Sequence, residues 1–169
     1  MPAVIVGISD CKLCADMESS LVTYALGSCI AVAAYDPAMS LGGMLHYMLP
    51  EATLDANKAK ENPFMFADTG IPALLRGLAS RGANLRRLTV YLIGGAQVVS
   101  GHELFQIGKR NHQAARKLLW KAGVLVAAEA VGGEVSRTVR MEVRTGRLYI
   151  REAGGADCEL VRRGGLKGN

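Results

Sequence analysis

Two short apolar runs separated by Asp36-Pro37 constrain the fold of this chain more than any other feature. Residues 29–35 and 44–49 have the length and the composition of β-strands, and an Asp-Pro pair is typical of a turn. The first expectation is therefore an antiparallel hairpin. Cys29 begins its first strand, directly after the flexible pair Gly27-Ser28, and His46 lies in its second strand.

The length of the loop decides which residues of this hairpin face each other. If residues 36–39 form a four-residue loop, Tyr35 pairs with Ser40 and the same ladder places Cys29 opposite His46. Directly opposed Cβ atoms lie roughly 4.5–5.5 Å apart, so the sulfur and the imidazole would meet. A slip of one residue would turn them to opposite faces, and the glycines at 42–43 leave room for a bulge.

A thiol beside an imidazole suits nucleophilic catalysis at a carbonyl. The thiolate is the nucleophile, and a neighbouring imidazole takes the thiol proton and returns it to a leaving amine. The Thr23 hydroxyl is a candidate to hold the ring, and the backbone N–H of Cys29, with Gly27 or Ser28, is a candidate oxyanion site. The structural alternative is that Cys29 is a small buried apolar residue and His46 a satisfied polar one.

The residues around this pair resemble a known family. The resemblance rests on two motifs, one from Thr23 to Asp36 (T-x-x-L-G-S-C-x-A-V-x-x-Y-D) and one from Gly42 to Pro50 (G-G-M-x-H-x-M-L-P). Together they are similar to the signature of CheD, the chemoreceptor glutamine deamidases of bacterial and archaeal chemotaxis. The similarity continues in chain order through Ala67-Asp68, Gly94-Gly95-Ala96, Ile107-Gly108, Arg110-Asn111, Gly132-Gly133, Arg137 and Gly146.

The resemblance implies a function and a set of partners. It gives Cys29, His46 and Thr23 the catalytic roles in converting receptor glutamines to glutamates through a thioester, with no cofactor. The expected substrate is the cytoplasmic helical bundle of methyl-accepting chemoreceptors. Gly94 and Gly95 are expected to support the site by letting backbone pass close to the catalytic loop.

Two other functions are compatible with the same sequence. One is a regulatory binding module that docks a CheC-type phosphatase of the response regulator, with or without catalysis. The other is a generic cysteine amidase or peptidase.

The remaining elements predict an α+β fold in one domain, residues 1–169. Strands are expected at 20–24 and 88–93, and a helix in 66–81 that begins near Asp68 or Thr69 because Pro72 fits only its first turn. A helix at 109–121 and a strand at 124–128 complete a βαβ crossover, and 137–152 form a hairpin across Thr145-Gly146. The resemblance implies a layered β-sandwich flanked by helices, similar to deamidating bacterial toxins. The tail at 153–169 is expected to be partly frayed.

Composition argues against several classes of function. No apolar run approaches the roughly 20 residues of a membrane span, and the first residues lack the features of a signal peptide, so a cytoplasmic protein without membrane insertion is expected. The net charge of +5 permits acidic partners, but with 5% aromatic residues and no reader motif nucleic acid is not expected.

The other candidate motifs are weak. Cys11 and Cys14 have C-x-x-C spacing, but no second ligand pair follows, so no metal is expected, and a reversible disulfide between them is left open. The glycines at 94–95 lack the frame of a nucleotide-binding loop. His102 and His112 are expected to be solvated.

Overall fold

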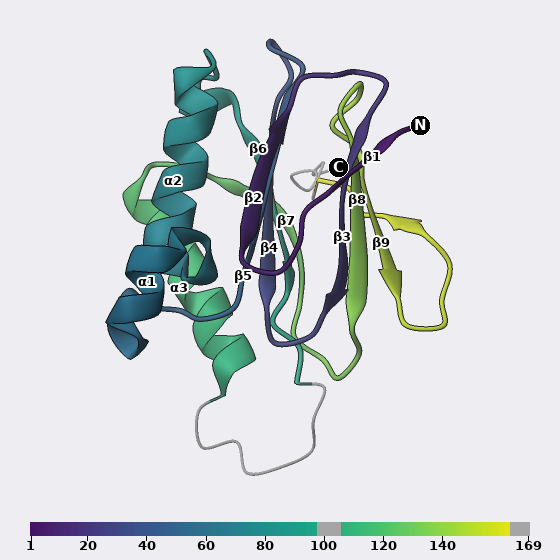
Figure 1. The fold of residues 1–169 in the computed structure, drawn as a ribbon. Helices are drawn as coiled ribbons and strands as arrows, with labels where there is room; N and C mark the ends of the chain where they lie inside the picture. The colour runs from purple at the N-terminus through teal and green to yellow at the C-terminus, as the bar shows by residue number, and fades with distance from the viewer. Residues whose placement is uncertain (98–105, 163–169) are drawn as a thin grey trace, which may run out of the picture.

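The computed structural model describes residues 1–97 and 106–162 of the 169-residue chain (Figure 1). The strands are β1 (Ala3–Ile5), β2 (Asp10–Cys14), β3 (Ser20–Leu26), β4 (Ile30–Asp36), β5 (Leu41–Tyr47), β6 (Thr89–Gly94), β7 (Val126–Val131), β8 (Arg137–Glu142), β9 (Leu148–Glu152) and β10 (Cys158–Glu159). The α-helices are α1 (Ala56–Glu61), α2 (Ala67–Ser80) and α3 (Ile107–Lys121), and 3₁₀ turns lie at Ala52–Leu54, Pro63–Met65 and Leu85–Arg87.

The strands form two sheets that face each other, and the helices cover one of them (Figure 1). One sheet has the order β1-β3-β8-β9-β10 and the other β2-β5-β4-β6-β7. Helices α2 and α3 pack on the outer face of the second sheet, against β5, β4 and β6. The prediction of an α+β fold with a layered sandwich and flanking helices is confirmed.

The predicted hairpin forms, but its register differs from the expected one by two residues. Asp36 pairs with Leu41, so the four-residue loop lies at 37–40, and Tyr35 pairs with Gly42 instead of Ser40. His46 is consequently opposite Ala31. Because side chains alternate with a period of two, a difference of two keeps the predicted face while moving Cys29 from a direct to a diagonal neighbour of His46.

Strand β4 is buried on both faces, which explains its continuous apolar sequence. Ile30, Val32 and Ala34 pack toward α2 and α3. Their neighbours Ala31, Ala33 and Tyr35 pack toward the other sheet, with side chains from β3, β8 and β9. The hairpin therefore lies in the middle layer of the molecule, where neighbouring layers fix its position.

The crossover from β6 through α3 to β7 is present, with β6 and β7 parallel as predicted. The hairpin of β8 and β9 also forms, joined by a turn that contains Gly146. Helix α2 begins at Ala67, slightly earlier than expected, and Pro72 consequently lies beyond its first turn. The segment expected to fray after Glu152 forms a turn and then β10, which pairs with β9; residues 163–169 lie outside the described part.

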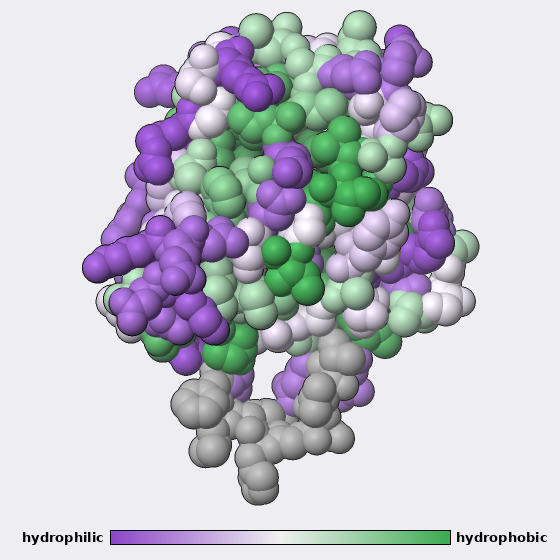
Figure 2. All heavy atoms as spheres, viewed as in Figure 1, coloured by the Kyte–Doolittle hydropathy of each residue, from purple (hydrophilic) through white to green (hydrophobic). Residues whose placement is uncertain are grey.

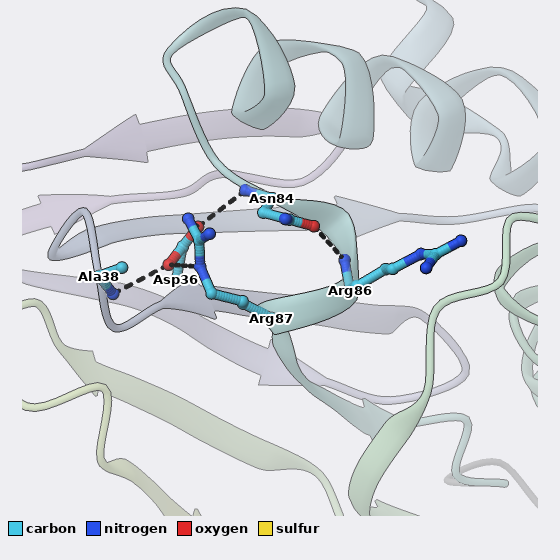
Figure 3. Close-up of polar contacts among 5 residues, drawn as sticks. All are labelled: Asp36, Ala38, Asn84, Arg86 and Arg87. Atoms are coloured by element: carbon cyan, nitrogen blue, oxygen red, sulfur yellow. Dashed lines mark hydrogen bonds and ion pairs between the residues drawn. The ribbon is translucent and has the colours of Figure 1, made fainter.

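A buried carboxylate fixes the turn end of the hairpin, as Figure 3 shows. Asp36 is fully buried and accepts hydrogen bonds from the backbone N–H groups of Ala38 at 2.9 Å and Asn84 at 2.8 Å. Arg87 completes the set with Nη2 at 2.9 Å. Burial acts to raise the pKa of Asp36, but these donors outweigh it and hold the pKa below its ordinary value. Asp36 thus ties the β4–β5 turn to the segment before β6.

Cys11 and Cys14 do not form a redox pair in this fold. Both are free thiols in β2, three residues apart along one extended strand. Cys11 packs toward the helices and Cys14 toward the opposite sheet. Three residues of strand span roughly 10 Å, well beyond the Cα separation that a disulfide accepts. The two cysteines are packing residues.

Candidate active site

Thr23 and His46 meet in the space between the two sheets. Thr23 comes from β3 and His46 from β5, and their exposed fractions are 0% and 1%. The Thr23 hydroxyl lies 2.8 Å from Nδ1 of His46 and 2.7 Å from the carbonyl oxygen of Val6. Val6 follows β1, which runs parallel to β3 and pairs with it next to Thr23. Three strands therefore position this chain of hydrogen bonds.

The hydrogen bonds of Thr23 determine which nitrogen of the imidazole carries the proton. A hydroxyl has one hydrogen, and a carbonyl oxygen can only accept. The Thr23 hydroxyl therefore donates to Val6 and accepts from Nδ1–H of His46. Nε2 is then a free lone pair, and it is buried with no hydrogen-bond partner among the described residues.

Burial also keeps the imidazole neutral. It lowers the pKa of His46 from 6.5 to about 4, because the charged form loses its hydration inside the sandwich. A neutral ring with a proton on Nδ1 and a bare Nε2 is the form in which histidine accepts a proton. The ring thus has both the tautomer and the charge of a general base.

Cys29 lies directly before the first residue of β4, on the face that His46 also occupies. It precedes Ile30, and Ile30 pairs with Tyr47, so Cys29 is a diagonal neighbour of His46 across the hairpin. Diagonal side chains remain within reach when one of them is long. Cys29 is half-buried at the edge of the inter-sheet core. Burial raises the pKa of its thiol, and the backbone N–H of Cys29 acts in the opposite direction. No hydrogen bond joins the thiol to Nε2.

The residues that directly follow β6 hold the loop that carries Cys29. The carbonyl oxygen of Cys29 accepts from the N–H of Gly95, and that of Gly27 accepts from Ala96, each at 2.8 Å. Gly94 has a φ of +112°, and a Cβ there would lie 2.2 Å from the Cys29 carbonyl oxygen. The glycines at 94–95 therefore allow the close approach of backbone to this loop that the sequence predicted.

The same loop also carries backbone hydrogen-bond donors. The backbone N–H groups of Gly27 and Ser28 bond to no acceptor among the described residues. The N–H of Cys29 faces its own sulfur. Peptide N–H groups grouped beside a thiol are the donors from which oxyanion sites are built.

Two residues of this site were not assigned a role from the sequence. Asn111 of α3 bonds to the Ser28 carbonyl oxygen. Arg137 of β8 is 8% exposed and donates to the carbonyl oxygens of Gly132 at 2.8 Å and Gly94 at 3.5 Å. Both belong to the motifs of the resemblance, but their contacts depend on tertiary structure that sequence spacing does not specify.

The surface near Val6 is partly apolar. Figure 2 shows apolar atoms over β1 and over the segment that leads to β2, where Ile5 and Ile8 are 47% and 63% exposed. Tyr24, next to Thr23, is 53% exposed. A separate groove of about 510 Å³ lies between α3 and the segment after β5.

The other titratable residues do not form a second centre. His112 is not simply solvated, because its Nε2 lies 3.1 Å from a carboxylate oxygen of Glu129 on β7. His102 lies outside the described residues. Within residues 1–97 and 106–162, no group of three His, Cys, Asp or Glu side chains is placed to hold a metal ion.

The fold is an α+β sandwich, and one end of its middle layer carries a thiol, a neutral imidazole and backbone N–H groups. Thiol hydrolases use this set of groups, so fold and site together indicate that class of enzyme. The family model described as CheD chemotactic sensory transduction matches residues 48–152. The chain belongs to the CheD family.

Curated relatives match over nearly the whole chain. A protein of Solibacter usitatus is 54% identical over 161 residues, with 95% of both chains covered. One of Syntrophus aciditrophicus is 48% identical and covers 95% of this chain and 100% of its own. One of Pyrococcus abyssi is 38% identical, with 85% and 89% covered. Each carries the name "Probable chemoreceptor glutamine deamidase CheD", the second with the number 1.

One solved structure is a more distant match. The Neisseria meningitidis protein NMB0706 superposes with a TM-score of 0.43 at 11% identity, over 79% of this chain and 63% of its own. In the part of the chain that the structure describes, none of the helices has the length and apolar character needed to span a membrane.

Proposed function

We propose that this chain deamidates glutamine side chains of chemoreceptors, with Cys29 as nucleophile, His46 as general base and acid, and Thr23 as the residue that orients His46. The names of the relatives supply the reaction and the substrate. The observation that supports the assignment of roles is the direction of the hydrogen bonds from His46 through Thr23 to Val6. It leaves Nε2 as the only ring atom able to accept a proton.

The first half of the reaction forms a thioester. A receptor glutamine presents its carboxamide carbon to Cys29, and Nε2 of His46 takes the thiol proton as sulfur attacks. The oxygen of the tetrahedral intermediate is stabilised by the N–H groups of Gly27, Ser28 and Cys29. The C–N bond then breaks, and the imidazolium returns its proton to the leaving nitrogen, which departs as ammonia.

The second half hydrolyses the thioester. Nε2, neutral again, takes a proton from water as the water oxygen attacks the acyl carbon. The C–S bond breaks, and the proton on Nε2 restores the Cys29 thiol. The products are a glutamate carboxyl group and ammonia, so each cycle consumes one water and replaces an amide by a negative charge on the receptor.

The free enzyme rests in a neutral form. Burial raises the pKa of the Cys29 thiol and lowers that of His46 to about 4, so both changes disfavour a thiolate–imidazolium pair. Proton transfer from sulfur to Nε2 therefore accompanies attack on the bound substrate. This arrangement protects the thiol from unspecific electrophiles, because the thiol form is a weak nucleophile.

The test is conversion of receptor glutamines. The cytoplasmic fragments of the cognate chemoreceptors are incubated with the enzyme, and their peptides are analysed for the mass change from carboxamide to carboxylate. Conversion with the wild-type chain and its loss with Cys29→Ala is the expected result. Equal conversion by both proteins would exclude Cys29 as the nucleophile, and cleavage of the receptor backbone would indicate a peptidase.

The proposal also sets a location and a partner. Because the substrate is the cytoplasmic helical bundle of the receptors, the enzyme is proposed to act in the cytoplasm. Docking of a CheC-type phosphatase remains a prediction of the resemblance, and no contact described above favours that role over catalysis.

A further inference from the structure

Asn111 links helix α3 to both strands of the catalytic hairpin. It is completely buried, and its Nδ2 donates to the carbonyl oxygen of Ser28 at 2.9 Å and to that of Met48 at 2.8 Å. Ser28 immediately precedes Cys29, and Met48 lies two residues after His46. The two hydrogens of one amide nitrogen therefore join the loop of the nucleophile to the strand of the general base.

The orientation of this amide follows from its partners. Both neighbours are carbonyl oxygens, so only the NH₂ end can face them. The Oδ1 atom is left buried, and none of the residues in 1–97 and 106–162 gives it a hydrogen-bond partner. An unpaired buried acceptor is unfavourable, and a residue selected for stability alone would avoid it. The arrangement is therefore consistent with a role for the two donors in holding the loop.

The main chain of Asn111 makes the same connection a second time. Its carbonyl oxygen accepts a hydrogen bond from the buried hydroxyl of Tyr47, which lies between His46 and Met48. With the bonds from Gly95 and Ala96, the carbonyl oxygens of residues 27, 28 and 29 are all hydrogen-bonded. The backbone of the loop that carries Cys29 is therefore fixed at three consecutive residues.

We propose that Asn111 is a positioning residue for the deamidation reaction: its side-chain amide sets the distance and orientation between the Cys29 loop and His46. The inference rests on the proposed function for its kinetic test. Asn111 does not touch the reacting atoms. It acts through the Ser28 and Met48 carbonyl groups, so its loss affects the chemical step more than binding of the receptor.

The decisive variant is Asn111→Asp, which keeps the shape of the side chain and removes both donor hydrogens. At pH 8 we expect kcat to fall about 10- to 100-fold with little change in KM, because a misplaced nucleophile slows the chemical step. The matched control is Gln113→Glu, the same change from amide to acid at an exposed position of the same helix. It should retain the kinetics of the wild-type enzyme.

The pH dependence separates positioning from a general loss of structure. A buried carboxyl group has a raised pKa, and once protonated it can donate one hydrogen bond. The activity of Asn111→Asp relative to wild type should therefore rise as the pH is lowered from 8 to about 5.5. A constant ratio over this range, or kinetics equal to wild type at pH 8, would overturn the proposal.

A measurement without receptor keeps the two proposals distinguishable. The rate at which iodoacetamide alkylates Cys29, resolved from the other cysteines by peptide mass analysis, should differ between Asn111→Ala and wild type and stay unchanged in Gln113→Glu. Wild type that fails to deamidate refutes the proposed function while leaving this comparison valid. Loss of the folded state in both Asn111 variants, seen by circular dichroism, would assign Asn111 to stability and refute positioning.

Discussion

The Thr23 hydroxyl accepts a hydrogen bond from Nδ1–H of His46 at 2.8 Å and donates one to the Val6 carbonyl oxygen at 2.7 Å. A hydroxyl here takes the position that a carboxylate holds in the Ser-His-Asp triad. A carboxylate would add a negative charge beside the ring and favour the imidazolium. The hydroxyl fixes the tautomer without that charge, in keeping with the lowered pKa of His46.

Replacing Thr23 by Val should slow deamidation by roughly 100-fold or more, because the ring loses the acceptor that holds its proton on Nδ1. Thr23→Ser keeps the hydroxyl and should stay within a few-fold of wild type. Steady-state kinetics on a receptor fragment measures both. Equal activities of the Val and Ser variants would show that the hydroxyl does not orient His46.

The Cys29 thiol should lack the neutral-pH reactivity of an ion-paired cysteine. Since burial raises its pKa above the ordinary value of 9.0, its rate of alkylation by iodoacetamide should keep rising with pH beyond pH 9. The exposed Cys158 gives an internal reference in the same digest. A plateau for Cys29 at pH 6–7 would instead show a thiolate–imidazolium pair in the free enzyme.

The lowered pKa of His46 makes folding stability depend on pH. The unfolded chain binds a proton at this histidine near pH 6.5 and the folded chain only near pH 4. Stability from this group is thus complete above pH 6.5 and is lost as the pH falls toward 4. At pH 5 the loss is about 2 kcal/mol. Urea unfolding at pH 7.5 and pH 5 measures this loss of unfolding free energy. In His46→Gln the loss between the two pH values should be smaller than in wild type by about 2 kcal/mol.

The carboxylate of Asp36 should contribute to stability through its donors. Asp36→Asn weakens the charge-assisted bonds from Arg87, Asn84 and Ala38, at a cost of about 2 kcal/mol. For a chain of this size the melting temperature should fall by roughly 4–8 °C. Arg86→Ala is the control, because Arg86 points away from the carboxylate (Figure 3). Equal melting temperatures for Asp36→Asn and wild type would contradict this account.

Gly94 should tolerate no side chain. Gly94→Ala would place Cβ 2.2 Å from the Cys29 carbonyl oxygen and should cost about 2–4 kcal/mol, with loss of activity as the loop shifts. Gly154→Ala is a matched control, since Gly154 also has a positive φ, +78°, but a Cβ there meets nothing within 4 Å. The control should cost about 1 kcal/mol and keep full activity. Thermal unfolding and the receptor assay test both.

Local patterns in the sequence were sufficient to predict the elements that bury one or two regular faces. The hairpin around Asp36-Pro37, helix α2, the β6–α3–β7 crossover and the β8–β9 hairpin all follow from apolar spacing and turn residues. The predicted hairpin register was wrong by two because loops at 36–39 and 37–40 satisfy the same sequence pattern. The second loop is the one in which Asp36 is the last residue of β4 and contacts Asn84 and Arg87, and these distant contacts are not visible in local sequence.

The geometry of the site was less accessible. Thr23 and His46 were expected to interact, but the role of the Val6 carbonyl depends on the parallel pairing of β1 with β3, which no local signal indicates. The contacts of Asn111 likewise join residues more than sixty positions apart. The C-x-x-C spacing suggested redox chemistry only because spacing does not distinguish a turn from an extended strand.

The residues proposed for the chemistry all lie in the first third of the chain, but the groups that hold their loop come from Gly95, Ala96 and Asn111. During synthesis the thiol, the imidazole and the hydroxyl leave the ribosome well before these supports do. A nascent or truncated chain that ends before β6 therefore carries every proposed reactive group and lacks all three of the residues that hold the Cys29 loop. Activity begins only when the second half of the protein has folded against the first.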